Sequence, residues 1–273
     1  KNLKKRNVPL ILLNARITSK SFNRWSKIRK FSESIFNLIS VAYPQNNETK
    51  LFLKKLNVKN IKLIGNLKFI QNKKLSKNSN KKEKKLFEQF KKYKTFVAAS
   101  THPTEEILAA KTHLLLKKKN KNFITVIIPR HIQRTNEIIS ELKKLKLEIV
   151  VHSSKNKNLD NKDIYIVDAF GESKKFYKIA STVFVGGSMI NRGGQNPLEP
   201  ARYGAKILHG PNVGNFKEIY NYLNSLSISS KVKTPMEILN SFKFKKNMSN
   251  VKKIDIIGQN ILKKTLKELN KSI

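Results

Sequence analysis

A glycine-rich stretch between residues 182 and 199 constrains the fold of this chain more than any other feature. It opens on Thr182-Val183-Phe184-Val185, a short apolar run that predicts a buried strand. Two glycine pairs follow within nine residues, at 186–187 and 193–194, with Arg192 between them. Glycine has no Cβ, so such a loop brings backbone N–H groups close to an anion. The strand and the loop together predict a phosphate or nucleotide site.

A helix start follows the loop. Asn196 is a good N-cap and Pro197 suits the first helical position. A helix N-terminus carries partial positive charge and free N–H donors, which favour phosphate. The alternative is a glycine-rich turn without a ligand, and the succession of strand, double glycine loop, arginine and capped helix argues against it.

The charge of the chain is extreme. Its 57 Lys+Arg residues against 18 Asp+Glu give a formal net charge of +39. Such a charge favours anionic partners such as nucleic acid, acidic lipid or a phosphorylated substrate. The basic residues are nearly all lysine and asparagine is also abundant, and a drift toward A/T-rich codons produces both biases without selecting a partner. Charge alone therefore leaves the partner open.

The composition excludes several kinds of site. The chain has no cysteine, so it has no disulfide, no cysteine-ligated metal and no thiol nucleophile, which is compatible with the cytosol. We find no run of about 18 apolar residues and expect no membrane span. The chain begins at Lys1 and reaches a predicted strand within a few residues, which is typical of a chain entered in the middle of a fold.

Predicted strands alternate with predicted helices, which indicates parallel βαβ units and a doubly wound sheet. Strands are predicted at 8–13, 40–43, 61–64, 95–99, 123–128, 147–152, 164–167 and 182–185. Helices are predicted at 21–39, 47–56, from Thr104 onward, 132–144, 176–180, up to 226, 235–242 and 251–270. Residues 71–94 are polar and lysine-dense, and we expect a linker that becomes helical toward its end.

The unusual residues follow the predicted strands. They are Arg16, Lys68, Ser100, Arg130, Glu172 and the loop 186–199. In a doubly wound fold these positions converge on the carboxyl edge of the sheet, where ligands bind. Taken singly, Arg16 is a solvated arginine and Lys68 one lysine among many. His102 is a candidate general base or phosphate contact, although a lone histidine is more often a capping or structural group.

These residues resemble a known family. The segment Gly186-Gly187-Ser188 through Arg192-Gly193-Gly194-Gln195-Asn196-Pro197-Leu198-Glu199-Pro200 is similar to the signature of the 3-deoxy-D-manno-octulosonic acid (Kdo) transferases. Further motifs occur in the family's order: Asn14-Ala15-Arg16, Gly65-Asn66-Leu67-Lys68-Phe69, Ala98-Ala99-Ser100-Thr101-His102, Pro129-Arg130-His131, Gly171-Glu172, and Gly210-Pro211 with Asn215-Phe216. The resemblance covers essentially the whole chain.

The resemblance implies an α/β fold of GT-B type: two Rossmann-like domains with parallel doubly wound sheets that face each other across a cleft, the first domain incomplete. Residues 1–70 would form the C-terminal part of the acceptor-side domain, and 71–94 the linker and the start of the second domain. Residues 95–250 would form the nucleotide-sugar domain and 251–273 a C-terminal helix.

The implied activity is the transfer of Kdo from CMP-Kdo to a lipid A precursor in lipopolysaccharide biosynthesis, with inversion and without a metal or another cofactor. The implied partners are CMP-Kdo, the phosphorylated lipid A precursor and an anionic membrane surface, and no nucleic acid is expected. The implied location is peripheral, on the cytoplasmic face of the inner membrane of a Gram-negative cell.

The resemblance also implies roles for particular residues. The CMP-binding segments would be Pro129-Arg130, Phe170-Gly171-Glu172 and Asn196-Pro197-Leu198-Glu199, with Glu199 on the ribose hydroxyls. Arg16 and Lys68 would form a cationic pair that stabilises the transition state, because the departing CMP builds negative charge.

The chain departs from the family pattern in its first part. Family members begin with a membrane-anchoring segment and a half-domain that carries the catalytic base, a glutamate in a Gly-Glu context. The single Gly-Glu here is Gly171-Glu172, in the nucleotide domain, so the general base is expected to lie outside this chain. Gln195 stands where histidine is commonest and Phe170 where methionine is usual. We do not expect His102 to act as the general base in place of this glutamate.

Three alternatives remain. The chain is another GT-B enzyme with a uridine- or adenine-linked donor, a fragment that binds nucleotide without catalysis, or a basic nucleic-acid-binding protein. The last needs neither the glycine loop nor the ordered motifs, and no nucleic-acid-binding motif is recognisable.

Overall fold

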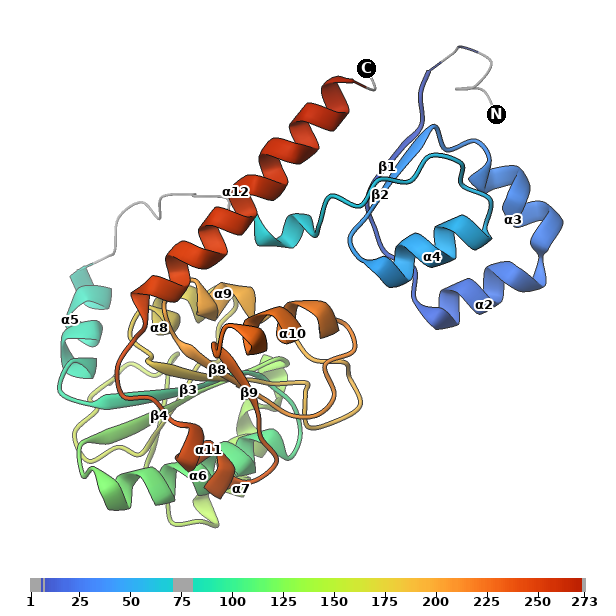
Figure 1. Cartoon of the computed structure of the whole chain (residues 1–273). Helices are drawn as coiled ribbons and strands as arrows, with labels where there is room; N and C mark the ends of the chain where they lie inside the picture. The colour runs from blue at the N-terminus through green and yellow to red at the C-terminus, as the bar shows by residue number, and fades with distance from the viewer. Residues whose placement is uncertain (1–5, 7, 71–80, 272–273) are drawn as a thin grey trace. The chain divides into compact units, whose positions relative to one another are not determined.

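The computed structural model describes residues 6, 8–70 and 81–271 (Figure 1). The chain divides into two compact units. The first comprises residues 1–73 and 253–273, and the second residues 74–252. Each unit is described by itself below.

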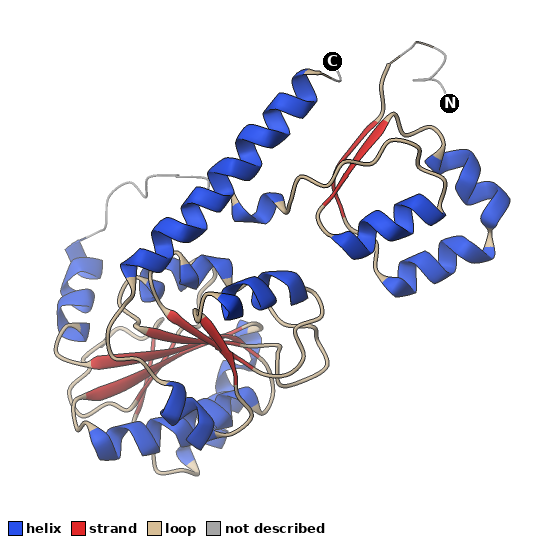
Figure 2. Cartoon of the chain, viewed as in Figure 1, coloured by secondary structure: helices blue, strands red, loops and turns tan. Residues whose placement is uncertain are grey.

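The second unit is built on a parallel seven-stranded sheet with the order β5-β6-β4-β3-β7-β8-β9 (Figure 2). The strands are β3 (Lys94–Thr101), β4 (Phe123–Pro129), β5 (Ile149–Val151), β6 (Ile164–Ile166), β7 (Thr182–Val185), β8 (Lys206–His209) and β9 (Ser229–Lys231). The chain passes from β3 outward through β4 and returns on the other side of β3 as β7. The strand order therefore reverses between β3 and β7, which is where α/β sheets bind ligands.

Helices cover both faces of this sheet (Figure 1). One face carries α6 (Glu105–Lys119), α7 (Thr135–Lys143, after the 3-10 turn η2, Ile132–Arg134) and α11 (Pro235–Ser241). The other carries α8 (Ser173–Tyr177), α9 (Leu198–Ala201) and α10 (Lys217–Ser225). A further helix, α5 (Lys81–Phe90), precedes β3. The predicted α/β fold with a parallel sheet is confirmed.

The core of the second unit follows from the sequence of its central strands. Strands β4 and β7 are buried along their whole length, as is typical of a parallel sheet covered on both faces. Phe96, Phe123 and Phe184 pack in one cluster with Leu116 and Ile138 of the helices α6 and α7. Burial of side chains of this size contributes about 1.5–3 kcal/mol each, so the cluster fixes the sheet against its helices.

The first unit contains a two-stranded parallel sheet of β1 (Ile11–Ala15) and β2 (Val41–Pro44), with α2 (Ser19–Lys27), α3 (Arg29–Phe36), α4 (Asn47–Lys55) and the 3-10 turn η1 (Leu67–Phe69). Its core joins Ala42 and Leu53 to Phe36 and Ala15. The predicted strand 61–64 is wrong: it is reduced to one bridge between Ala42 and Ile61. The apolar run that suggested it is only partly buried, with Leu63 exposed.

Two further predictions for the first unit need correction. The predicted helix 21–39 is two helices, because Ile28 leaves the helical region at φ −115° and ψ 50°. The strand predicted at 8–13 as buried lies at Ile11–Ala15, and Val8, Leu10 and Leu13 are exposed.

The last helix, α12 (Met248–Asn270), starts in the second unit and continues into the first. Within the first unit its Glu268 forms an ion pair with Lys62 (2.6 Å), and its backbone oxygen accepts a hydrogen bond from the Tyr43 hydroxyl (3.3 Å). A Cβ at Gly258 would collide with the carbonyl oxygen of Phe69, so glycine permits the close approach of this helix.

The sequence analysis also missed two strands, β8 and β9. Strand β9 has the polar sequence Ser-Ser-Lys, which carries no strand signal, and it forms through parallel pairing with β8. Helix α5 occupies much of the predicted linker, of which residues 71–80 lie outside the described part. None of the helices in the described part of the chain combines the length and the apolar character that a membrane crossing requires.

A buried polar network closes the amino edge of the second unit. The Asp163 carboxylate accepts hydrogen bonds from His113 Nε2 (3.2 Å) and the Glu148 amide (2.9 Å), and it pairs with the Lys117 ammonium. Thr125 lies 3.1 Å from His113 Nδ1. Burial alone would raise the pKa of Asp163, but the hydrogen bonds from His113, Lys117 and Glu148 outweigh it and hold this pKa well below its usual range.

We predict that Asp163→Asn lowers the free energy of unfolding by about 2 kcal/mol at pH 7. The reason is that His113 and Lys117 lose the buried carboxylate with which they interact. A carboxyl whose native pKa is depressed stabilises the fold above its unfolded pKa and loses this contribution as the pH falls. Denaturant unfolding from pH 7 downward should therefore show a smaller acid destabilisation for Asp163→Asn than for the wild type.

The exposed Asp160→Asn provides the control, with a change close to zero at pH 7. Equal effects of the two substitutions would contradict the assignment of this network.

Candidate nucleotide-binding edge

The loop after β7 is organised by a carboxylate of the protein itself. Glu105, the first residue of α6, is completely buried. Its Oε1 accepts hydrogen bonds from the amides of Ser188 (3.0 Å) and Met189 (2.8 Å). Its Oε2 accepts from the amides of Gly187 (2.8 Å) and His102 (2.9 Å). One side chain therefore satisfies four backbone donors at the point where the strand order reverses.

This contact changes the interpretation of the first glycine pair. The sequence predicts that its backbone N–H groups face an anion. The Gly187 N–H does so, but its acceptor is the Glu105 carboxylate (2.8 Å), whereas the Gly186 N–H donates to the Ala99 carbonyl (2.8 Å). The glycines remain necessary, since a Cβ at Gly186 would lie 2.7 Å from Glu105 Oε2 and would collide with the Ser100 carbonyl. The N–H groups of residues 187–189 therefore position the loop and are not directed at a ligand.

The start of α6 has an unusual backbone. The helix is predicted from Thr104 onward, but it begins at Glu105, and Thr104 makes no side-chain capping bond and has φ +78°. A β-branched residue rarely adopts this left-handed conformation. The Glu105 amide bonds to the His102 carbonyl (3.0 Å), so the chain makes a tight turn before the helix. The turn is needed because it directs the Glu105 carboxylate back toward β7.

His102 lies beside the glycine loop. Its Nε2 is buried and has no hydrogen-bond partner among the described residues. A Cβ at Gly187 would be 3.4 Å from both this Nε2 and Gln195 Nε2. Burial, followed by the nearby charges of His131 and Arg192, lowers the pKa of His102, so the imidazole is neutral at pH 7. The backbone amide of His102 holds the Glu105 carboxylate, and its side chain presents one ring nitrogen, Nε2, unpartnered within the described part of the chain, at the site.

Cationic groups surround this position. The rings of His102 and His131 are 5.5 Å apart, and the charges of Arg130, Arg134 and Arg192 all act on His102. Arg134 is committed to the buried Glu106 (3.0 Å), whereas Arg130 and Arg192 are exposed. Two arginines are thus available to an anion at this edge.

The predicted CMP-binding segments lie along the same edge. Strands β6, β4, β3 and β7 are neighbours in the sheet, and Phe170-Gly171-Glu172, Pro129-Arg130 and Asn196–Glu199 follow three of them. Pro129 and Leu198 are buried, so they offer only backbone atoms, whereas the side chain of Arg130 is exposed. Phe170 is 73% exposed, which is unusual for so large an apolar group.

Helix α8 links two of these segments. Its Lys174 lies 3.6 Å from Glu199, and its Lys175 lies 2.8 Å from Glu172. The predicted cap is displaced by one residue, because Pro197 and not Asn196 is the N-cap of the four-residue helix α9. The Asn196 side chain instead accepts a local hydrogen bond from the Leu198 amide (3.1 Å). The structure therefore brings both Glu172 and Glu199 to lysines in the first turn of α8.

The predicted cationic pair lies in the first unit. The Asn14 side chain accepts a hydrogen bond from the Leu67 amide (3.1 Å), which joins the end of β1 to η1. Burial, and then the charge of Arg16, lower the pKa of Lys68. Arg16 therefore acts electrostatically on Lys68 within the first unit. No cluster of three or more His, Asp or Glu side chains suited to a metal occurs within the described ranges.

Comparison with known proteins places this geometry in a family. Residues 1–71 match the family model described as 3-deoxy-D-manno-octulosonic-acid transferase (kdotransferase). The 3-deoxy-D-manno-octulosonic acid transferase of Rickettsia prowazekii is 32% identical over 254 residues, which cover 93% of this chain and 54% of the relative. The chain belongs to the 3-deoxy-D-manno-octulosonic acid transferase family. It spans about half the length of the curated relatives that it matches.

Solved structures support the fold. The C-terminal CMP-Kdo binding domain of WaaA from Acinetobacter baumannii aligns with a TM-score of 0.55 at 19% identity, over 66% of this chain and 96% of that domain. An alpha,alpha-trehalose-phosphate synthase (UDP-forming) from Burkholderia vietnamiensis aligns with a TM-score of 0.55 at 10% identity, over 99% of this chain and 68% of the synthase. At these identities the alignments establish the GT-B type of fold.

We predict that Glu105→Gln lowers the free energy of unfolding by about 3 kcal/mol, because two of the four amides would face an NH2 group in place of an oxygen. Hydrogen exchange at residues 187–189 should become faster than the global change explains. The exposed Glu88→Gln on α5 serves as the control, with neither effect. Unchanged protection of these amides would contradict the role of Glu105.

Thr104→Gly should raise the free energy of unfolding by about 1 kcal/mol, because relief of the left-handed backbone exceeds the entropy that glycine adds to the unfolded chain. Thr104→Ala keeps the Cβ and should give no such gain. Denaturant unfolding of both variants measures the difference, and a loss of stability in Thr104→Gly would show that the threonine side chain makes a necessary contact.

Proposed function

We propose that this chain forms the donor-binding part of a glycosyltransferase that transfers Kdo from CMP-Kdo to a phosphorylated lipid A precursor, with inversion and without a metal. The observation that carries the proposal is the convergence of Arg130, Glu172 and Glu199 on the carboxyl edge of one parallel sheet, in a chain of this family. The identity of the relatives supports the class of reaction.

The donor's phosphate is held by cations at the reversal of strand order. Arg130 follows β4, Arg192 lies in the glycine loop, and both are exposed beside the neutral His102. Arginine presents planar donors that match phosphate oxygens. The free Nε2 of His102 adds one hydrogen bond that does not depend on positive charge. Because the loop amides are taken by Glu105, side chains rather than the glycine N–H groups carry this contact.

The nucleoside is held by the two segments joined through α8. Glu199 accepts hydrogen bonds from the ribose hydroxyls, since a carboxylate provides acceptors only. Phe170 offers an exposed ring for the base, and Glu172 lies beside it, paired to Lys175. Pro129, Gly171, Asn196, Pro197 and Leu198 shape the site through their backbone.

In the first unit, Arg16 and Lys68 stabilise the leaving group. Two cations held close together repel each other, and the negative charge that grows on CMP as the glycosidic bond breaks relieves this repulsion. An inverting transfer also needs a base for the acceptor hydroxyl. The single Gly-Glu of this sequence, Gly171-Glu172, belongs to the nucleotide segment, so we assign this chain donor binding and leaving-group stabilisation.

The proposed acceptor and place of action are those that the family resemblance implies, and the charge of the chain is compatible with them. A phosphorylated lipid A precursor lies in an acidic membrane surface, which attracts a chain of net charge +39. We therefore place the protein on the cytoplasmic face of the inner membrane as a peripheral enzyme.

The test is the binding of CMP. We expect CMP to raise the melting temperature of the folded chain, and Arg130→Ala or Glu199→Ala to weaken CMP binding about ten-fold in calorimetry through loss of a charge-assisted hydrogen bond. The exposed Arg29→Ala and Glu88→Ala serve as matched controls without effect.

The outcome also separates the alternatives. Tighter binding of UDP or ADP than of CMP would indicate another GT-B enzyme. Salt-sensitive binding of DNA that Glu199→Ala leaves unchanged would indicate a nucleic-acid-binding protein. Absence of any CMP-dependent stabilisation in a folded sample would contradict the nucleotide site.

A further inference from the structure

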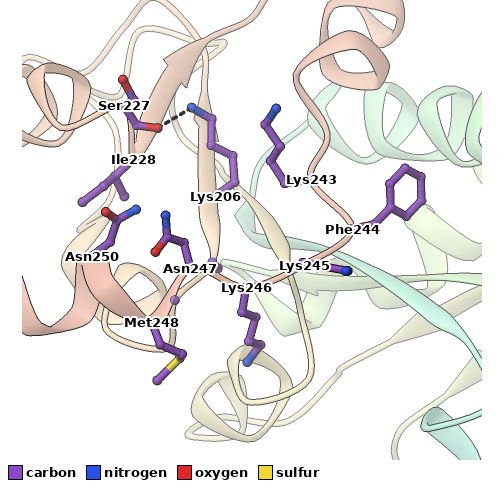
Figure 3. Close-up of a pocket in the computed structure, with 12 residues that line it drawn as sticks. Lys206, Ser227, Ile228, Lys243, Phe244, Lys245, Lys246, Asn247, Met248 and Asn250 are labelled. Atoms are coloured by element: carbon purple, nitrogen blue, oxygen red, sulfur yellow. Dashed lines mark hydrogen bonds between the residues drawn. The ribbon is translucent and has the colours of Figure 1, made fainter.

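A cavity lies at the amino edge of the sheet in the second unit, opposite the nucleotide edge. Its volume is about 570 Å³, and all twelve lining residues fall between 204 and 250 (Figure 3). Lys206 is the first residue of β8, whereas His209 at the other end of this strand faces the nucleotide edge. The cavity and the proposed CMP site therefore lie at opposite ends of the strands.

Two ammonium groups converge on one side of this cavity. Figure 3 shows the side chains of Lys206 and Lys243 extending to the same side, whereas Lys246 points the opposite way, toward the Tyr177 carbonyl (3.0 Å). Lys243 is held in place by its backbone, which exchanges two hydrogen bonds with the Thr182 hydroxyl (2.9 and 3.0 Å). The pair is thus fixed by the sheet and by the segment that follows α11.

The donors of this pair are only partly used. The Lys206 ammonium donates to the carbonyls of Ser227 (2.9 Å) and Ser229 (3.3 Å), and an ammonium has three donors. For the Lys243 ammonium no acceptor occurs among the residues that the structure describes. None of the twelve lining residues is acidic. The amides of Asn247 and Asn250 at the start of α12 complete the polar lining.

The electrostatics distinguish this pair from the many solvated lysines of the chain. Burial, followed by the charge of Lys243, lowers the pKa of Lys206. Elsewhere the partly buried ammonium groups of Lys162 and Lys175 each face a carboxylate. At Lys206 and Lys243 two like charges are brought together at a cavity without a counter-charge, and an anion would relieve the repulsion.

We propose that this cavity binds a phosphate group through Lys206 and Lys243. A tetrahedral phosphate presents several acceptors to the free ammonium donors and to the two asparagine amides, and its charge compensates both lysines. The site is independent of the proposed function, because it lies at the amino edge and shares no residue with the CMP segments.

Two sources of phosphate fit this chemistry: a lipid headgroup and a soluble phosphorylated molecule. Phe244 and Met248 also line the cavity and are 45% and 58% exposed. Exposed apolar groups beside lysines are typical of contact with an anionic bilayer. The experiment therefore has one arm for each source.

The soluble arm uses pyrophosphate as the probe in calorimetry. Lys206→Gln/Lys243→Gln should weaken its binding at least about ten-fold, since two charge-assisted contacts are lost. The double variant Lys118→Gln/Lys119→Gln removes the same charge from the exposed end of α6 and should change the affinity less than about two-fold. The comparison is made in an Arg130→Ala background, so that phosphate binding at the nucleotide edge does not contribute.

The lipid arm uses sedimentation with vesicles of phosphatidylcholine, with and without phosphatidylglycerol. Weaker binding to the anionic vesicles in Lys206→Gln/Lys243→Gln and in Phe244→Ser, but not in the control, identifies a lipid headgroup. If pyrophosphate binding falls in the lysine variant while vesicle binding does not, the ligand is soluble. Equal losses in the lysine variant and the control, in both arms, would overturn the proposal.

Lys206 also bonds to the protein, so its replacement can disturb the fold. The single variant Lys243→Gln, at an exposed side chain, avoids this effect and should by itself reduce the affinity for pyrophosphate. An unchanged melting temperature with unchanged pyrophosphate affinity in this variant would equally overturn the proposal.

Discussion

The second unit depends on the buried carboxylate of Glu105 at the point where the strand order of its sheet reverses. This one group accepts hydrogen bonds from residues 102, 187, 188 and 189, and it thereby joins the turn after β3 to the loop after β7. Burial of a carboxylate is costly unless its oxygens accept hydrogen bonds. The four backbone amides donate these bonds to the completely buried Glu105. The geometry of the proposed CMP site follows from this contact, since it fixes His102 and the glycine loop side by side.

The same contact explains the strained backbone around it. Ser100 and Thr104 both adopt positive φ (+55° and +78°), the first where the pairing of β3 with β4 shifts register and the second at the turn into α6. Together they direct Glu105 back under Gly186, whose missing Cβ leaves room for it. Strain at sites of this kind persists because surrounding bonds over-determine it. The two edges of the sheet then differ in character: the carboxyl edge holds arginines around a neutral histidine, and the amino edge holds the network of Asp163 and the lysine cavity.

Much of the fold could be predicted because it follows from local patterns. The apolar runs of β3, β4, β6 and β7 are buried on both faces, and such runs are recognisable as strands without neighbours. The predicted strand 61–64 and the missed strand β9 show the limit, since short strands are decided by the partner available to them. Of the residues predicted to share one edge, Ser100, Arg130, Glu172 and the loop 186–199 follow strands of the seven-stranded sheet, whereas Arg16 and Lys68 lie in the first unit.

The sequence by itself determined the family, the parallel α/β architecture and the segments at the carboxyl edge, because glycine spacing, apolar periodicity and ordered motifs are local properties. Only the tertiary structure decided what each group at that edge contacts. It showed that the amides of residues 187–189 are bound to Glu105, that Arg16 and Lys68 act on each other electrostatically within the first unit, and that Lys206 and Lys243 share a cavity without a carboxylate. These pairings join residues up to 84 positions apart, and a separation of that kind is set by the packing of the sheet and not by the local sequence.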